Sequence, residues 1–98
     1  MLTSKQRARL RACANQTETI LQIGKDGINE KLIVQVEDAL TARELIKLRV
    51  LETAPVSPRE AAEELARQTD SESIQVIGTR FVLYRRNQEK AKYDDCLS

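Results

Sequence analysis

The tetrapeptide Gly24-Lys25-Asp26-Gly27 is the segment whose residue types most clearly suggest chemistry. A glycine can adopt a positive φ, and its missing Cβ atom lets a ligand come close to the backbone. The segment falls between a predicted strand and a predicted helix, so its amides would lie at the positive end of the helix dipole. Together with the cation of Lys25, this arrangement favours a phosphate group. The same pattern also occurs in ordinary turns, so a purely structural role is the alternative.

Most other site chemistry is excluded by missing residues. The loop lacks the third glycine and acidic partner of a dinucleotide site, and no Gly-Lys-Ser/Thr follows as in nucleotide-triphosphate loops. The chain has no histidine, which removes the commonest general base and metal ligand. It has only one Phe and two Tyr and no Trp, too few for a platform on which bases stack. We therefore expect no enzymatic activity, no metal site and no cofactor.

Basic residues are concentrated in two parts of the chain, although the formal net charge is only +1. Residues 1–51 carry nine Lys and Arg against six Asp and Glu, and residues 73–86 carry three arginines and no acid. Residues 52–72 carry six acids against two arginines. The folded chain is therefore expected to have a basic side, suited to an anionic partner, and an acidic side.

A first helix is predicted from Thr3 to about Ala14, because Thr3 and Gln6 have the spacing of a capping box. Its apolar side consists of four residues: Leu2, Leu10, Cys13 and Ala14. Its cations lie along the two edges of that side: Lys5 and Arg9 on one, Arg7 and Arg11 on the other. Four cations without an acid favour contact with phosphate, and the alternative is a solvated helix whose arginines extend into water.

Three elements are predicted in the middle of the chain. Residues 19–23 form a short strand, residues 28–42 a helix capped by Asn29 or Asp26, and residues 44–51 a second strand. In that second strand one face is apolar and the other is partly basic, with Ile46, Leu48 and Val50 on the first and Leu45, Lys47 and Arg49 on the second.

Three more elements follow. Ser57, Pro58 and Glu60 start a helix that runs to about Thr69. Residues 73–77 and 80–85 form a hairpin whose loop begins with Gly78, as a type II′ turn requires. Its register places four apolar residues on one face: Ile74, Val76, Phe81 and Leu83.

These elements predict an α/β (α+β) fold of order αβαβαββ, in which a mixed four-stranded sheet packs with three helices around a single hydrophobic core. Residues 1–86 form the only domain, and the polar residues 87–98 a flexible tail. The chain shows no membrane span and no signal-peptide core, so we expect a cytoplasmic protein. In that compartment Cys13 and Cys96 are expected to be reduced thiols.

Several stretches, taken in order, resemble the CRM domain family, and most closely its single-domain bacterial YhbY-type members. The stretches are LTSKQRARLRACANQ, LQIGKDGINE, ARELIKLRVLE, SPREAAEELA and IQVIGTRFVLYRR. The resemblance covers about residues 2–86 and implies the αβαβαββ fold. It also implies RNA binding through a GxxG loop similar to the one by which KH domains clamp a nucleic-acid backbone. Bacterial members of the family associate with precursors of the large ribosomal subunit.

The resemblance identifies two groups of candidate RNA-binding residues: the loop Gly24, Lys25, Asp26 and Gly27, and the first-helix cations Lys5, Arg7, Arg9 and Arg11. To these we add four further cations: Lys31, Lys47, Arg49 and Arg80. The leading hypothesis is a monomeric protein that contacts structured ribosomal RNA of the large-subunit precursor. The alternative is a protein-interaction module that docks a ribosomal or assembly protein through the acidic third helix, with Glu60, Glu63 and Glu64.

Overall fold

The computed structural model describes residues 2–86, and the predicted tail lies outside the described residues. The described part forms seven elements in the predicted order: α1 (Ser4–Ala14), β1 (Thr19–Ile23), α2 (Glu30–Arg43), β2 (Leu45–Val50), α3 (Pro58–Gln68), β3 (Glu72–Ile77) and β4 (Arg80–Tyr84). None of these helices is long and apolar enough to cross a membrane.

Side-chain caps fix where the three helices begin. Thr3 Oγ1 accepts a hydrogen bond from the Gln6 amide at 3.1 Å, and Ser57 Oγ accepts one from the Glu60 amide at 3.2 Å. Both capping boxes are complete, as predicted. Before α2, Asn29 Oδ1 accepts from the Leu32 amide at 2.9 Å. Because Asn29 rather than Asp26 is the cap, α2 begins two residues later than the sequence predicts.

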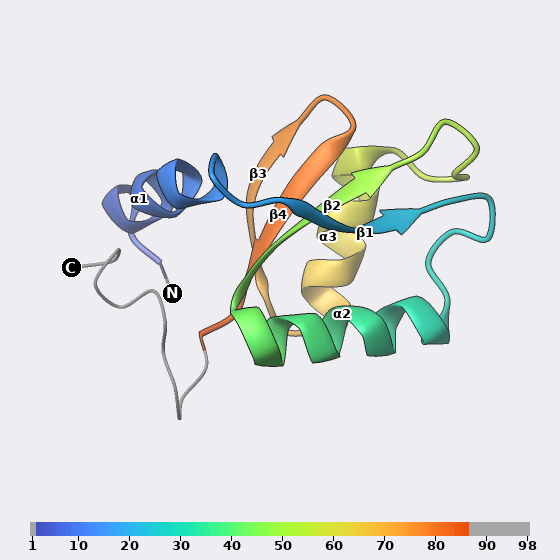
Figure 1. Ribbon diagram of the computed structural model, residues 1–98, viewed down its shortest axis with the longest axis horizontal. Helices are drawn as coiled ribbons and strands as arrows, with labels where there is room; N and C mark the ends of the chain where they lie inside the picture. Colours follow the sequence, from blue (N-terminus) through green and yellow to red (C-terminus); the bar gives the residue numbers. More distant parts are fainter. Residues whose placement is uncertain (1, 87–98) are drawn as a thin grey trace.

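The four strands form one mixed sheet in the order β1-β2-β4-β3 (Figure 1). β1 and β2 are parallel because α2 connects them as a crossover, whereas β2–β4 and β4–β3 are antiparallel. The predicted mixed four-stranded sheet is confirmed. At the hairpin, Gly78 has a φ of +58°, as the first central position of a type II′ turn requires.

The main hydrophobic core lies between one face of the sheet and the two helices α2 and α3. Its centre consists of fully buried residues from the strands and both helices: Ile23, Val36, Leu40, Ile46, Leu48, Leu65, Phe81 and Leu83. This is the predicted apolar face of β2, joined by the apolar stripes of α2 and α3.

A second, smaller core lies on the opposite face of the sheet, where α1 packs over one end. Leu10 and Ala14 of α1 are fully buried there against strand residues. The expectation of a single core is therefore wrong, because β2 and β4 are apolar on both faces at this end: Leu45, Val82 and Tyr84 face α1.

Ile74 does not share a face with Val76, and this part of the predicted register is wrong. The pairing of β3 with β4 shifts between Ser73 and Gln75, as at a β-bulge. A bulge adds one residue to one strand, so the side chains before it point to the other face. Ile74 consequently packs in the core under α1, whereas Val76 packs against the main core.

Cys13 corrects a further expectation. It is disulfide-bonded in the structure, and none of the cysteines described there is free. The prediction of a reduced thiol at Cys13 is therefore wrong. That prediction rested on the compartment and on the spacing of cysteines in the sequence, and neither describes the folded surroundings of Cys13.

Candidate functional site

The Gly24–Gly27 loop is a tight turn at the carboxyl end of β1. The amide of Gly27 donates to the carbonyl of Gly24 at 3.0 Å, which closes the turn. Lys25 and Asp26 form its exposed tip, and neither makes an ion pair or hydrogen bond with another described residue. The Lys25 ammonium is therefore free to meet an anion.

The two glycines of the loop have different environments. Gly27 is buried and has a φ of +65°, and a Cβ atom there would lie 2.9 Å from Pro55 Cγ. At Gly24 the nearest atom, Leu51 Cδ1, would lie 3.8 Å from such a Cβ, which is ordinary contact. Gly27 thus makes room for the protein's own chain. Of the two glycines, only Gly24 leaves room for a ligand to approach.

The side of the loop that faces α3 is acidic. A shallow depression of about 430 Å³ lies there, and its lining includes Asp26, Glu60 and Glu64 together with Gly27 and Pro55. Carboxylates repel phosphate. An anionic ligand of the loop is therefore expected to approach from the side away from α3, where the loop joins the end of β1.

The N-terminus of α2 is stabilised largely by the side chains of its own cap and first turn. Asn29 caps it, and Glu30 places a carboxylate in the first turn, where the helix dipole favours a negative charge. Lys31 is exposed in the same turn. Because α2 packs on the main-core face of the sheet, Lys31 belongs to the helical layer.

Beyond the part that α1 covers, the second face of the sheet is open and basic. Strand pairing aligns two rows of side chains across it: Gln22, Arg49, Arg80 and Ile77 in one, and Thr19, Lys47, Val82 and Gln75 in the other. Cross-strand partners point to the same face. The first row begins only two residues before Gly24, so this open face adjoins the loop.

The three cations of the open face have no partner within the described chain. The side chains of Lys47, Arg49 and Arg80 make no ion pair or hydrogen bond with any residue of the range 2–86. Arg49 and Arg80 stand directly opposite each other on adjacent strands. Like charges in this position destabilise a sheet. An anion bound between them would remove that repulsion.

The two edges of α1 differ in their surroundings. Arg7 donates to the carbonyl of Ser73 at 2.9 Å and pairs with Glu72, so it ties α1 to β3. Arg11 and Asn15 follow Arg7 at intervals of four residues and therefore lie along the same edge. Asn15 reaches the open face, where it lines a pocket. The Arg7/Arg11 edge is thus the one beside the open face, whereas Arg9 lines a separate hollow.

The acids of α3 serve mainly to hold their own helix. Glu60 Oε1 accepts from the Ser57 amide at 3.2 Å, which completes the capping box. Glu64 pairs with Arg67 one turn later. Of the three acids that the docking hypothesis needs, Glu63 alone has no such role among the described interactions.

The structure brings together some of the predicted site residues and separates others. Lys47, Arg49 and Arg80 gather beside the loop, and Arg11 lies toward their side of α1. Arg7 is ion-paired, Lys31 lies in the helical layer, and Lys5 and Arg9 lie on the other edge of α1. Sequence reasoning missed the polar residues of the open face: Asn15, Thr19, Gln22 and Gln75. Only strand pairing and the position of α1 reveal them.

No metal site is formed by the residues that the structure describes, because no three His, Cys, Asp or Glu side chains gather there. The arrangement consists instead of cations and amides, which bind anions and hydrogen-bonding surfaces.

Comparison with known proteins identifies several relatives. A family model described as CRS1 / YhbY (CRM) domain matches residues 2–85. "Probable RNA-binding protein YqeI" of Bacillus subtilis is 39% identical over 94 residues, which is 96% of this chain and 98% of the relative. "Probable RNA-binding protein MJ0652" of Methanocaldococcus jannaschii is 37% identical over 94 residues, which is 94% of this chain and 69% of the relative. The solution structure of Staphylococcus aureus protein SAV1595 has a TM-score of 0.79 at 47% identity, covering 94% of this chain and 96% of that one.

Proposed function

Because the chain belongs to the CRS1/YhbY (CRM) domain family, we propose that it is an RNA-binding protein that contacts structured ribosomal RNA during assembly of the large ribosomal subunit. The names of two relatives, which describe probable RNA-binding proteins, support RNA as the partner. The observation that carries the proposal is a group of three cations on the open sheet face beside the loop, Lys47, Arg49 and Arg80, whose side chains have no partner among the described residues.

The RNA backbone would lie across the open sheet face and end at the loop. Arg49 and Arg80 would hold phosphates between β2 and β4, and Lys25 would hold a further phosphate near Gly24. The acidic depression beside α3 keeps the backbone off the other side of the loop. Such contacts position an RNA without reading its sequence. Recognition would then depend on the shape of a folded RNA.

The resemblance to bacterial YhbY-type proteins supports the precursor of the large subunit as the source of this RNA. We further propose that the protein acts as a monomer in the cytoplasm, bound to those precursors. Ribosomal proteins of the precursor would be secondary contacts.

Charge reversal on the open face tests the proposal. In the variant Arg49→Glu/Arg80→Glu, affinity for a large-subunit ribosomal RNA transcript should fall by about tenfold or more, because phosphate contacts dominate such binding. The variant should also leave the large-subunit precursor fractions of a gradient. Arg43→Glu/Arg59→Glu is the matched control, because both arginines are exposed in the helical layer and have the same charge change. Equal losses in both variants would contradict an RNA interface on the open face.

The same gradient distinguishes RNA binding from the alternative, in which α3 docks a protein. Co-sedimentation that is lost on Glu63→Lys but kept by Arg49→Glu/Arg80→Glu would favour docking of a basic protein by α3. Co-sedimentation with the small subunit alone would exclude the large-subunit precursor as the partner.

A further inference from the structure

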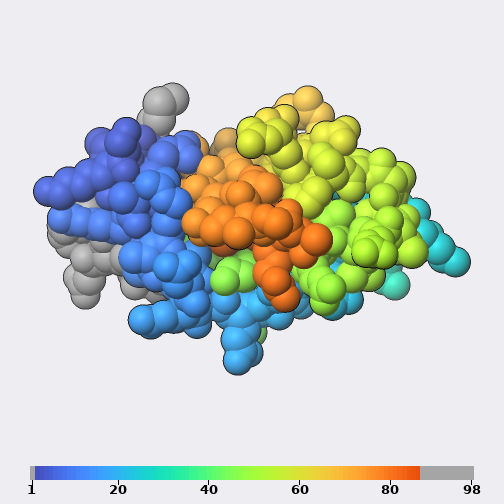
Figure 2. Space-filling model, turned by 90° about the horizontal axis from the view of Figure 1, so that it is seen from above, coloured from blue at the N-terminus to red at the C-terminus, as the bar shows by residue number. Residues whose placement is uncertain are grey.

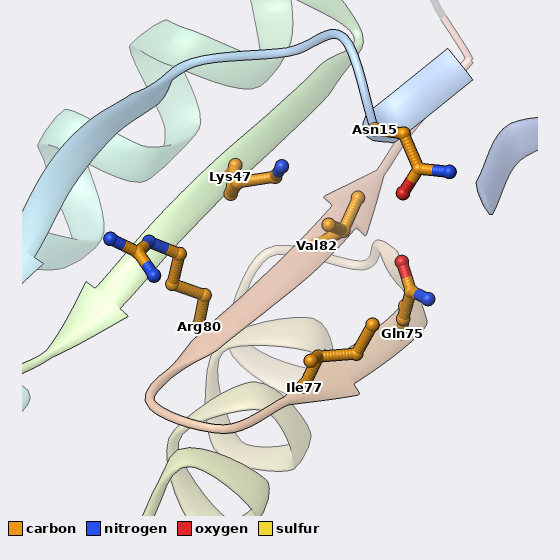
Figure 3. Close-up of a pocket in the computed structure, with 6 residues that line it drawn as sticks. All are labelled: Asn15, Lys47, Gln75, Ile77, Arg80 and Val82. Atoms are coloured by element: carbon orange, nitrogen blue, oxygen red, sulfur yellow. The ribbon is translucent and has the colours of Figure 1, made fainter. Parts of the chain in front are cut away.

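The open sheet face contains a pocket at its centre, between the end of α1 and the hairpin. It has a volume of about 120 Å³ and is lined by the C-cap of α1 and by residues of β2, β3 and β4: Asn15, Lys47, Gln75, Ile77, Arg80 and Val82. The six side chains come from four parts of the sequence (Figure 3). In the space-filling view the hairpin lies between the blue surface of α1 and the green and yellow surface of residues 51–68 (Figure 2).

One end of the pocket carries two side-chain amides. Gln75 and Asn15 point toward each other from β3 and from the end of α1 (Figure 3). Neither side chain makes a hydrogen bond with a described residue. Each amide offers two donor hydrogens and an acceptor oxygen. Together they present the mixed donor and acceptor pattern that matches the edge of a nucleobase.

The other end is cationic, and the floor between the ends is apolar. The guanidinium of Arg80 points across β2, away from the two amides (Figure 3). Lys47 lies between Arg80 and the pair of amides (Figure 3). Val82 is 3% exposed at the bottom, whereas Ile77 is 61% exposed at the side. Ile77 is one of only two strongly exposed large hydrophobic residues in the described chain. A flat apolar group lying on Ile77 and Val82 would remove this surface from water.

We propose that this pocket binds one unpaired nucleotide of the RNA, with its base on Ile77 and Val82, its edge at Asn15 and Gln75, and its phosphate at Lys47 and Arg80. This inference rests on the proposed function. The nucleotide must be unpaired, because the edges and faces of paired bases are engaged within the duplex. A bulge or a loop in folded RNA supplies such a nucleotide. The pocket thus makes the protein prefer interrupted helices to continuous ones.

Binding of two RNAs that differ in one feature tests this preference. The probes are a fully paired, fluorescein-labelled RNA duplex and the same duplex with a single-stranded bulge, measured by fluorescence anisotropy. The wild type should bind the bulged RNA several-fold more tightly. Asn15→Ala/Gln75→Ala should reduce that difference to within about twofold, because it removes both amides that contact the base edge and removes no cation. Gln35→Ala/Gln68→Ala, which removes two exposed amides of the helical layer, should keep the preference.

A second measurement does not depend on RNA. In ¹⁵N NMR spectra, AMP, GMP, CMP and UMP are added separately at millimolar concentration, and inorganic phosphate is the comparison. The side-chain amide signals of Asn15 and Gln75 should shift with at least one nucleotide and stay in place with phosphate. Chemical shifts of the other residues report whether the protein remains folded.

The outcomes separate the two proposals. If the wild type binds both RNAs equally and no nucleotide moves the two amide signals, the pocket proposal is overturned while RNA binding stands. If inorganic phosphate moves these signals as much as the nucleotides do, the pocket is an anion site only, and the proposal is again overturned. If no RNA binds but a nucleotide moves the signals, the proposed function fails and the pocket is a site for free nucleotides, which overturns its proposed role in RNA recognition.

Discussion

The two glycines of the loop show that one residue type can serve two purposes within four positions. Gly27 has a φ of +65° and is packed against Pro55, so its conformation and the space around it both require glycine. Gly24 has neither constraint. A GxxG pattern therefore contains one position that shapes the loop and one that leaves the backbone accessible.

Gly27→Ala is expected to lower the free energy of unfolding by about 1–2 kcal/mol, because an L-residue is strained at positive φ. The contact of the new methyl group with Pro55 adds to this loss. Gly24→Ala should change stability by less than about 0.5 kcal/mol. Urea unfolding monitored by circular dichroism measures both. Equal losses would show that the structural constraint is not specific to Gly27.

Lys25→Glu is expected to weaken RNA binding without a change in melting temperature. The side chain is exposed and has no partner in the described chain, so its replacement breaks no interaction that stabilises the fold. Lys31→Glu is the matched control, since Lys31 is also exposed but lies in the helical layer. Anisotropy with the same RNA compares the two. If both substitutions weaken binding alike, the RNA also contacts the N-terminus of α2.

At the scale of elements, α1 packs on the sheet through a small core and an ion pair, and its Cys13 is disulfide-bonded. Arg7 connects it to β3 through Glu72 and the carbonyl of Ser73. The Arg7 and Glu72 side chains are 32% and 38% exposed, so solvent weakens their attraction. Leu10 and Ala14 add apolar contacts with the strands, and Leu2 and Cys13 pack beside them. Because this core is small and the ion pair is weakened by solvent, α1 is expected to open more readily than the sheet.

Arg7→Met should reduce stability by at most about 1 kcal/mol, the range of partly exposed ion pairs, because the apolar part of the side chain is kept. It should increase hydrogen exchange in α1 more than in β4. Lys5→Met is the control, as Lys5 is exposed and has no partner in the described chain. Uniform exchange across α1 and β4 would mean that α1 unfolds only with the whole domain.

The elements themselves could be predicted from the sequence, because caps and apolar periods are local. Thr3, Asn29 and Ser57 mark the helix starts within a residue or two. The bulge before Gln75 could not be predicted, since it arises when β3 pairs with β4. The position of α1 was equally inaccessible, because its stripe of Leu10 and Ala14 does not specify which sheet face it covers.

The same limit applies to the candidate site. The cations Lys47, Arg49 and Arg80 could be picked out from charge and strand alternation. That Arg49 lies opposite Arg80 depends on the strand order β2-β4, which the sequence leaves open. Asn15 and Gln75 are ordinary polar residues until the fold brings α1 and β3 to one pocket.

For the whole molecule, the near-zero net charge hides a separation of charges between two layers. The open sheet face carries Lys47, Arg49 and Arg80, and the helical layer carries the acids of α3 on the opposite side. A charged RNA therefore meets an attractive surface in one orientation and a repulsive one in the other. This separation would orient the protein on the RNA, although its overall charge gives little attraction to the RNA.

The salt dependence of binding counts the phosphates held by the open face. Each phosphate contact contributes about −0.7 to −0.9 to the slope of log K against log salt concentration. Arg49→Gln/Arg80→Gln should therefore make the slope less negative by about 1.4–1.8, if each arginine holds one phosphate. Titration of the duplex RNA between about 50 and 200 mM KCl measures the slope. Arg43→Gln/Arg59→Gln removes the same charge from the helical layer and should leave the slope unchanged. A change of equal size in both variants would mean that the RNA responds to total charge rather than to the open face, and the layered arrangement of charges would then have no part in binding.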